Sequence, residues 1–360
     1  MTVMDHTLGA DVYAGRVART LNSGFITMMI SVGHRTSLFD VMAALPPATS
    51  HEIATAAGLA ERYVREWLAT MTSAHIVDYD ARTATYFLPI EYAAVLARGA
   101  GSNSLAPMAE MLSMLASVED LVVAGFHGGG GVQPQAYDQL RQLMSAQKRE
   151  KIDESYVDAL LRLMPGMRAR LEHGAAVLDV GCGDGAVIHA MARRFPRSRF
   201  RGYDIARAAI ERAYEQRDEA GVSNVEFLHR DAQRLADDDM DARRYDLVLA
   251  LESLHELSFP TAVLRNIAAA LDGDGVFLMQ ETVASSHLAR NIEHPFAPML
   301  YALSCMHAVP VALGDERGEA LGRMWGQERA VRMLNEAGFR NVRFETLAVD
   351  PLSYYCVAVK

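Results

Sequence analysis

The sequence has few cysteines and no long apolar run. Its 360 residues include three cysteines, Cys182, Cys305 and Cys356, which lie far apart. This excludes a disulfide scaffold and a cysteine-rich zinc site, and it is typical of a reducing compartment, so we expect a cytoplasmic protein. Mean hydropathy is +0.02, and no apolar stretch is long enough to cross a bilayer. The first residues lack a basic segment followed by an apolar one, so we expect no secretory signal.

Positive charge is also scarce. The formal net charge is −10, and residues 1–100 contain no lysine. Contacts to phosphates supply most of the non-specific affinity of a protein for DNA. The composition therefore argues against nucleic acid as the main partner.

The N-terminal pattern predicts a winged helix, which we assign to residues 1–100. After one long helix, two short helices are followed by two β segments joined by a polar turn. The expected elements are a helix over Tyr13–Ser31, helices that begin near Thr49 and Glu61, and strands over Ile76–Tyr79 and Thr85–Leu88.

Residues 101–172 predict a helical region that a run of glycines at 128–131 interrupts. The run has two interpretations, which the sequence leaves open. It could form a mobile lid, in which case Tyr137 would reach a ligand, or it could be a flexible linker. Beyond it, residues 173–360 alternate strands with helices. This predicts an α/β fold with a mostly parallel, Rossmann-like sheet.

The strongest motif runs from Val177 to Gly185, where an apolar strand enters a glycine turn and then a helix. The spacing also satisfies a dinucleotide fingerprint, with Asp204 at a plausible distance for ribose. Asp179 distinguishes a dinucleotide from a ligand that carries an ammonium group. A pyrophosphate would repel a buried carboxylate inside the strand, whereas an ammonium group would attract it. A nicotinamide-dependent oxidoreductase therefore leaves Asp179, and the later Asp231, unexplained.

From these residues onward, the sequence resembles the class I S-adenosylmethionine-dependent methyltransferases over residues 174–360. The match involves several ordered segments, and the final pair of strands implies an antiparallel last strand. The segments are Asp179–Gly183, Phe200–Asp204, Val225–Leu228 with Asp231–Ala232, Tyr245–Ala250, Leu271–Leu278, Val342–Leu347 and Tyr354–Val359.

The N-terminal region indicates which group of these methyltransferases the sequence resembles. A winged helix before such a domain is similar to plant-type small-molecule O-methyltransferases and to a bacterial group often labelled methyltransferase or transcriptional regulator. The bacterial group matches better. Segments that resemble it are Ile30–Arg35, Gly128–Val132, Ser304–His307 and Met324–Gly326.

The resemblance implies a site for S-adenosylmethionine, with S-adenosylhomocysteine as the product. Asp204 would accept hydrogen bonds from both ribose hydroxyls, and Asp231 would lie beside the adenine. The residues expected at the cofactor are Asp179, Gly181, Cys182, Gly183, Asp204, Ile205, Asp231, Ala232 and Glu252.

Two histidines are candidate bases, since a phenol or alcohol acceptor must lose a proton. His255 follows the fourth strand, and Glu256 or Glu252 would orient its ring. His307 lies in an insertion that usually covers the acceptor in methyltransferases of this layout. For each histidine, a purely structural role stays open.

The acceptor pocket is expected to include Tyr137, Cys305, Met306 and Trp325. Cys305 is interpreted as pocket wall because nothing nearby would activate a thiolate. Methionines at helical spacing, from 108 to 114, leave a lipophilic acceptor open. No metal site is expected, because His287 and His294 are interpreted as surface residues.

The expected function is therefore methyl transfer from S-adenosylmethionine to a small-molecule acceptor, on oxygen or another heteroatom. The alternative is a DNA-binding regulator that senses S-adenosylmethionine. The would-be recognition helix carries Arg62 and Arg65 beside Glu61 and Glu66, which disfavours DNA. We expect the winged helix to form a homodimer through the helix around residues 22–30 and to add a wall to the partner's pocket.

Overall fold

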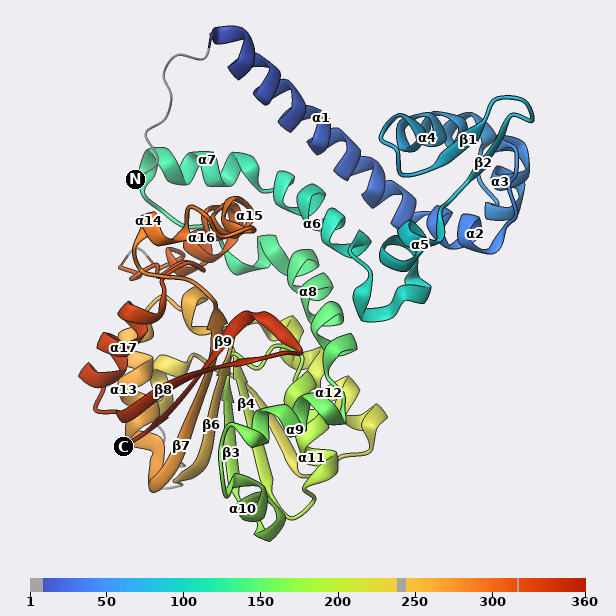
Figure 1. The fold of residues 1–360 in the computed structure, drawn as a ribbon. Coiled ribbons are helices and arrows are strands. Elements are labelled where there is room, and N and C mark those ends of the chain that lie inside the picture. Colours follow the sequence, from blue (N-terminus) through green and yellow to red (C-terminus); the bar gives the residue numbers. More distant parts are fainter. Residues whose placement is uncertain (1–8, 238–243, 316) are drawn as a thin grey trace. The chain divides into compact units, whose positions relative to one another are not determined.

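The computed structural model describes residues 9–237, 244–315 and 317–360 (Figure 1). The chain forms two compact units, Met1–Ala116 (unit 1) and Ser117–Lys360 (unit 2). Helix α6 (Ala106–Ala116) packs against α1 (Ala10–Arg35) within unit 1, whereas α7 (Glu119–Gly128) begins unit 2. The helical region expected at 101–172 is thus shared between the units, and the division at residues 100 and 172 stays a prediction.

No helix in the described parts of the chain is long and apolar enough to span a membrane.

Unit 1 contains the expected winged helix. Local signals fix its helix ends: the Thr49 side chain and Glu52 form a capping box, and Gly58 ends that helix in the left-handed conformation. After α1, its elements are α2 (Leu38–Ala44), α3 (Ser50–Ala57), α4 (Glu61–Ser73), β1 (Asp78–Asp80), β2 (Thr85–Phe87), α5 (Ile90–Leu96) and η1 (Arg98–Asn103).

Unit 1 has its own core around an aromatic pair. The rings of Phe39 and Trp67 meet edge to face, 5.1 Å apart, and the Trp67 indole N–H donates to the carbonyl of Met29 on α1. A Cβ on Gly33 would lie 2.6 Å from both rings, so α1 approaches this core closely only because residue 33 is glycine. The C-terminal end of α1 is therefore anchored in the core.

Unit 2 is built on a seven-stranded sheet, in the order β5-β4-β3-β6-β7-β9-β8. The first five strands of that order are parallel, and β9 pairs antiparallel with both β7 and β8. This confirms the expected α/β fold with an antiparallel last strand. The strands are β3 (Ala176–Val180), β4 (Arg199–Asp204), β5 (Val225–His229), β6 (Tyr245–Leu251), β7 (Leu271–Thr282), β8 (Arg340–Leu347) and β9 (Asp350–Val359).

Helices cover both faces of this sheet (Figure 1). Two separate hydrophobic clusters fill the space between the sheet and the helices, one on each face. One face carries α9 (Glu154–Arg162), α10 (Met167–His173), α11 (Ala186–Arg194) and α12 (Arg207–Ala220), and the other carries α13 (Pro260–Ala270) and α17 (Gln327–Glu336).

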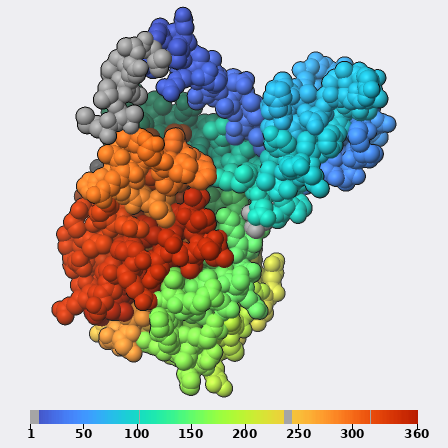
Figure 2. Space-filling model, viewed as in Figure 1, coloured from blue at the N-terminus to red at the C-terminus, as the bar shows by residue number. Residues whose placement is uncertain are grey.

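An insertion between β7 and α17 packs onto the rest of unit 2, and Figure 2 shows it in orange against the red C-terminal part. It contains α14 (Leu288–Asn291), α15 (Ala297–Leu303), a π-helical turn η6 (Ser304–Ala308) and α16 (Val309–Ala312). Single π-helical turns occur frequently at functional sites. This one carries His307.

The end of the glycine run is packed against this insertion. A Cβ on Gly131 would collide with the backbone of residues 310–314, and the Val132 N–H donates to the Pro310 carbonyl at 2.9 Å. A Cβ on Gly130, in contrast, would meet nothing. Gly131 is therefore required by close packing, whatever the rest of the run does.

Candidate active site

The loop after β3 has a backbone conformation that favours glycine. Gly181 and Gly183 have φ of +73° and +56°, and a Cβ on Gly181 would collide with the Ser253 side chain. The N–H groups of Gly181 and Cys182 both donate to the Tyr203 carbonyl, at 2.8 and 3.0 Å. The loop thus turns sharply at the carboxyl end of the sheet, where ligands bind in such folds.

Asp179 is a buried carboxylate at this edge. It lies in β3, it is 3% exposed, and its Oδ1 has no hydrogen-bond partner. Burial raises the pKa of Asp179 to about 7, although the charge of Lys148 opposes the shift. An unpaired buried carboxylate fits a ligand that carries an ammonium group and disfavours one that carries a pyrophosphate.

Asp204 ends β4 beside the same loop. Its carboxylate accepts from the N–H of Gly183 at 2.9 Å and from that of Ala206 at 2.8 Å, so it is held in one orientation. Each oxygen keeps capacity for a further donor such as a hydroxyl. Ile205 follows it and is 43% exposed, which leaves an apolar surface next to Asp204 for a flat ring to cover.

Three other expected cofactor residues make contacts within the protein. The Cys182 side chain packs against Gly202, where a Cβ would lie 2.6 Å from its sulfur, and its thiol donates to the Gly183 carbonyl at 3.6 Å. Ala232 is buried in the core. Asp231 accepts from the backbone and side-chain N–H groups of Gln233, at 2.9 and 3.0 Å.

Glu252 has a strained backbone. It comes directly after β6 with φ of +58°, and its N–H donates to the Gln280 carbonyl at 2.9 Å. Left-handed conformations of residues other than glycine cluster at functional sites. The strain lies on the segment that leads into Ser253 and His255.

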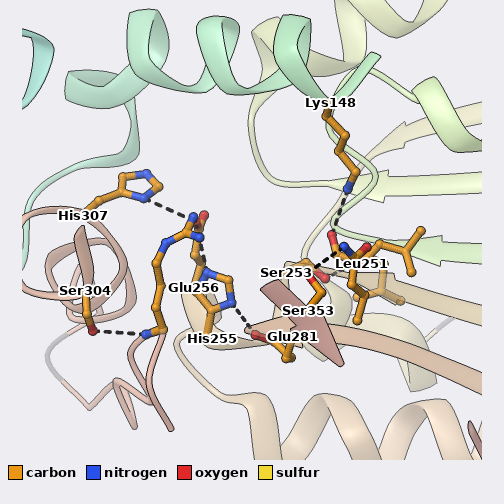
Figure 3. Close-up of polar contacts among 12 residues, drawn as sticks. Lys148, Leu251, Ser253, His255, Glu256, Glu281, Ser304, His307 and Ser353 are labelled. Carbon is orange, nitrogen blue, oxygen red and sulfur yellow. Dashed lines mark hydrogen bonds and ion pairs between the residues drawn. The ribbon is translucent and has the colours of Figure 1, made fainter. Parts of the chain in front are cut away.

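His255 forms a buried pair with Glu281 (Figure 3). Its Nδ1 lies 2.6 Å from Glu281 Oε2, and both side chains are completely buried. The carboxylate holds the proton on Nδ1, because a carboxylate only accepts hydrogen bonds. Nε2 has no hydrogen-bond partner, so this nitrogen is left to exchange a proton with a ligand.

Glu256 lies at the centre of a second cluster. Its Oε1 is 3.3 Å from His307 Nδ1, 3.6 Å from His255 Nε2 and 3.6 Å from Arg323 Nη2, and its Oε2 is 3.6 Å from Arg141 Nη2. One carboxylate thus links both candidate bases to two mostly buried guanidinium groups. The Nε atoms of both arginines are buried without a hydrogen-bond partner.

The pKa values of the two histidines are shifted in opposite directions. Burial alone would lower the pKa of His255, but Glu281 and Glu256 outweigh it and raise that pKa to about 9. Burial lowers the pKa of His307 to about 4, against the charge of Glu256. His307 is therefore neutral at pH 7, whereas His255 is held as a cation by its carboxylates.

Three of the four residues expected around the acceptor, Tyr137, Cys305 and Met306, lie beside His307. The Tyr137 hydroxyl donates to the Met306 carbonyl at 2.7 Å, and the Tyr137 ring meets the His307 imidazole edge to face. Tyr137 is 2% exposed, and its hydrogen bond to Met306 supports the π-helical turn. Cys305 is a free, partly exposed thiol, and Trp325 is buried with its indole N–H unpaired.

Four charged side chains at this site were not predicted from the sequence: Lys148, Glu281, Arg141 and Arg323. Glu281 had a signal, because it ends an apolar strand beside the strand that leads to His255. The other three come from helix α8 (Asp138–Lys151) and from the segment before α17, and no sequence pattern marked them. Within the described residues, no group of three histidine, cysteine or acidic side chains is placed to hold a metal ion.

Two family models match the chain. A model described as an Rv2258c-like winged HTH domain matches residues 24–98, and one described as a methyltransferase domain matches residues 171–346. The first lies in unit 1, and the second covers the sheet of unit 2 as far as Thr346, so that it leaves out all of β9.

Among characterised relatives, aklanonic acid methyltransferase DauC of Streptomyces sp. strain C5 is 31% identical over 180 residues, which are 48% of this chain and 78% of DauC. Polyketide synthase ThaQ of Burkholderia thailandensis is 31% identical over 155 residues, which are 43% of this chain and only 7% of ThaQ. The similarity to ThaQ thus concerns one small part of a much longer protein.

Solved structures share the fold over nearly the whole chain. An O-methyltransferase family protein from Burkholderia thailandensis has a TM-score of 0.70 at 13% identity and covers 98% of this chain and 99% of its own. Human N-acetylserotonin methyltransferase, solved with S-adenosylmethionine, has a TM-score of 0.62 at 15% identity and covers 99% of both chains.

Proposed function

Because the chain belongs to the S-adenosylmethionine-dependent methyltransferases that carry an N-terminal winged-helix domain, we propose that it methylates an oxygen atom of a small-molecule acceptor, with His255 as the base. The observation that carries this proposal is the buried pair of His255 and Glu281, with Nε2 of the imidazole unpaired at the carboxyl edge of the sheet. The name of DauC, an aklanonic acid methyltransferase, is consistent with a small organic acceptor.

The residues at the glycine loop fit the cofactor. Asp179 would offer an unpaired oxygen to its ammonium group, Asp204 would accept hydrogen bonds from its ribose, and the exposed side chain of Ile205 would offer an apolar surface for its adenine. When bound, S-adenosylmethionine supplies a methyl group on a positively charged sulfonium, whose charge also lowers the pKa of nearby cationic acids. The chain's own residues then position the acceptor and remove its proton.

In its neutral form, His255 would take the acceptor's proton at Nε2 as the new oxygen–carbon bond forms. Glu281 would keep the ring oriented through Nδ1 and stabilise the charge that the imidazole gains. Glu256 connects this ring to His307, whose neutral Nε2 is also unpaired. His307, supported by Tyr137, would bind the acceptor rather than take its proton, because its pKa is too low for a base at pH 7.

Charge around the base favours oxygen over nitrogen as the methylated atom. Arg141 and Arg323 both approach Glu256, so two guanidinium groups share one carboxylate. An oxygen acceptor gains negative charge as it loses its proton, which these cations stabilise. An amine would instead gain positive charge on methylation, which they disfavour.

The test is a variant of His255 assayed for both binding and turnover. We expect His255→Gln to keep S-adenosylhomocysteine affinity in calorimetry, since the residue lies outside the glycine loop. Release of S-adenosylhomocysteine with a panel of phenols and alcohols should fall by about 10²-fold or more. The exposed His287→Gln is the matched control. If wild type methylates only amines, or if His255→Gln turns over normally, the proposal is wrong.

We propose a second copy of the chain as the partner of unit 1. Val17, Leu21 and Phe25 recur at four-residue spacing on α1 and are 59%, 62% and 68% exposed. Residues at this spacing lie on one face of a helix, and exposed apolar patches of this kind mark interaction sites. The patch adjoins and overlaps the segment 22–30 that the sequence analysis assigned to a dimer.

The alternative, a DNA-binding regulator, has little support from charge on α4. Arg62 is paired with Glu66, and Arg65 donates to both oxygens of Glu61, so each arginine is matched by a carboxylate four residues away. Phosphate binding would require breaking these pairs. A gel shift with the DNA upstream of the gene tests this alternative, and specific binding would revive it.

A further inference from the structure

Lys148 on α8 reaches the edge of the sheet at which the cofactor binds. Its Nζ donates to the Leu251 carbonyl at 3.1 Å (Figure 3). Leu251 is the last residue of β6, and β6 pairs directly with β3, which carries Asp179. The ammonium group therefore lies at the junction of the two strands whose ends form the binding edge.

Helix α8 is fixed beside the glycine loop by other contacts. Arg149 forms an ion pair with Asp184, a loop residue that is 3% exposed. A Cβ on Gly183 would come within 3.8 Å of the Ser145 hydroxyl. A single turn of α8 thus contacts the loop or the neighbouring strand end through Ser145, Lys148 and Arg149. These contacts fix the position of Lys148, unlike that of a lysine on a free surface.

The charges at this edge complement those of an amino acid. Asp179 is a buried carboxylate with an unpaired oxygen, and Lys148 is close enough to oppose the rise in its pKa, yet the structure records no direct ion pair between these two residues. A buried carboxylate and an ammonium group at one edge that do not form an ion pair with each other can instead bind a ligand that carries both a positive and a negative charge. The methionine end of the cofactor has one ammonium group and one carboxylate.

We propose that Lys148 is a cofactor-binding residue that takes the carboxylate of the methionine end, while Asp179 and the Leu251 carbonyl take its ammonium group. In the unliganded chain, the lysine ammonium donates to the same carbonyl that the ligand's ammonium would use. Binding exchanges one ammonium for the other, and Lys148 turns to the carboxylate. A lysine suits this exchange because its ammonium is a point charge on a flexible stem.

The test compares two ligands that differ only in the carboxylate. Calorimetry without acceptor, at a pH well above 7 so that Asp179 stays ionised in both proteins, gives the Kd of S-adenosylmethionine and of its decarboxylated form for wild type and for Lys148→Met. We expect Lys148→Met to weaken S-adenosylmethionine about tenfold or more and to leave the decarboxylated ligand unchanged or tighter. Lys151→Met, an exposed lysine on the same helix, is the control and should change neither Kd.

Three results would overturn the role of Lys148. These are an unchanged Kd for S-adenosylmethionine, an equal loss for both ligands, and a wild type that binds both ligands equally well. Lys148→Arg retains a donor for the carboxylate, so it should preserve most of the preference for S-adenosylmethionine even if Lys148→Met folds poorly. These Kd values depend neither on the acceptor nor on His255. The role of Lys148 is therefore tested separately from the proposed reaction.

Discussion

At the scale of single residues, Asp179 couples cofactor binding to pH. Its pKa of about 7 means that the carboxylate is half protonated near neutral pH, and only the ionised form attracts an ammonium group. We expect the Kd of S-adenosylhomocysteine to rise as the pH falls from 7.5 to 5.5, approaching a tenfold change per unit below the pKa. Calorimetry at several pH values measures this.

Asp179→Asn is the matching variant for this prediction. It removes the titrating group, so its affinity should be low and nearly independent of pH over the same range. A wild-type Kd that is the same at pH 5.5 and pH 7.5 would show that Asp179 is not the group that meets the ammonium.

The sequence indicated residues at or just after the ends of strands, but not the side chains that contact them. Asp179, Asp204 and His255 could be placed because a parallel sheet brings the ends of its strands to one edge. Glu281, the carboxylate that orients His255, is 26 residues further along the chain, and the sequence analysis chose the neighbouring Glu256 and Glu252 instead. Glu256 does contact His255, at 3.6 Å, but as part of a cluster with His307.

At the scale of elements, the glycine run and the insertion act together. Gly131 packs against the backbone of residues 310–314, immediately after the π-helical turn that carries His307. We expect Gly131→Ala to destabilise unit 2 by roughly 1–3 kcal/mol, because the added methyl must displace backbone. Urea unfolding followed by circular dichroism measures the change.

Gly130→Ala is the natural control, because a Cβ there meets nothing. It should unfold at nearly the wild-type midpoint. Equal midpoints for the two variants would contradict the packing described here and would favour an unconstrained linker over the whole run.

The order and type of the elements were predictable, whereas their supporting contacts were not. Alternating strand and helix patterns gave the sheet, and the polar turn before Thr85 gave the hairpin of the winged helix. Arg141 and Arg323 come from α8 and from the segment before α17, and tertiary packing alone brings them to Glu256. The hydrophobic pattern of a single helix or strand does not predict contacts between side chains of different elements.

At the scale of the whole molecule, the exposed stripe on α1 predicts self-association. We expect a homodimer in sedimentation at micromolar concentration, and the double variant Leu21→Glu with Phe25→Glu should be monomeric because it places charges on the apolar face. Arg19→Gln, on the same helix, should leave the dimer intact. A wild-type monomer, or a double variant that still dimerises, would contradict this assignment.

The proposed base of the oxygen methylation is His255, which Glu281 holds through Nδ1. The most direct measurement is the pH dependence of kcat/KM for wild type and Glu281→Gln, with an acceptor identified in the panel. Only neutral His255 can take a proton, so wild-type kcat/KM for the acceptor should rise with pH and level off no higher than about 9, the pKa that Glu281 and Glu256 give His255 in the chain without cofactor. Removing the carboxylate charge lowers that pKa, so Glu281→Gln should reach a lower plateau at a lower pH. Profiles that rise at the same pH in both proteins would contradict the claim.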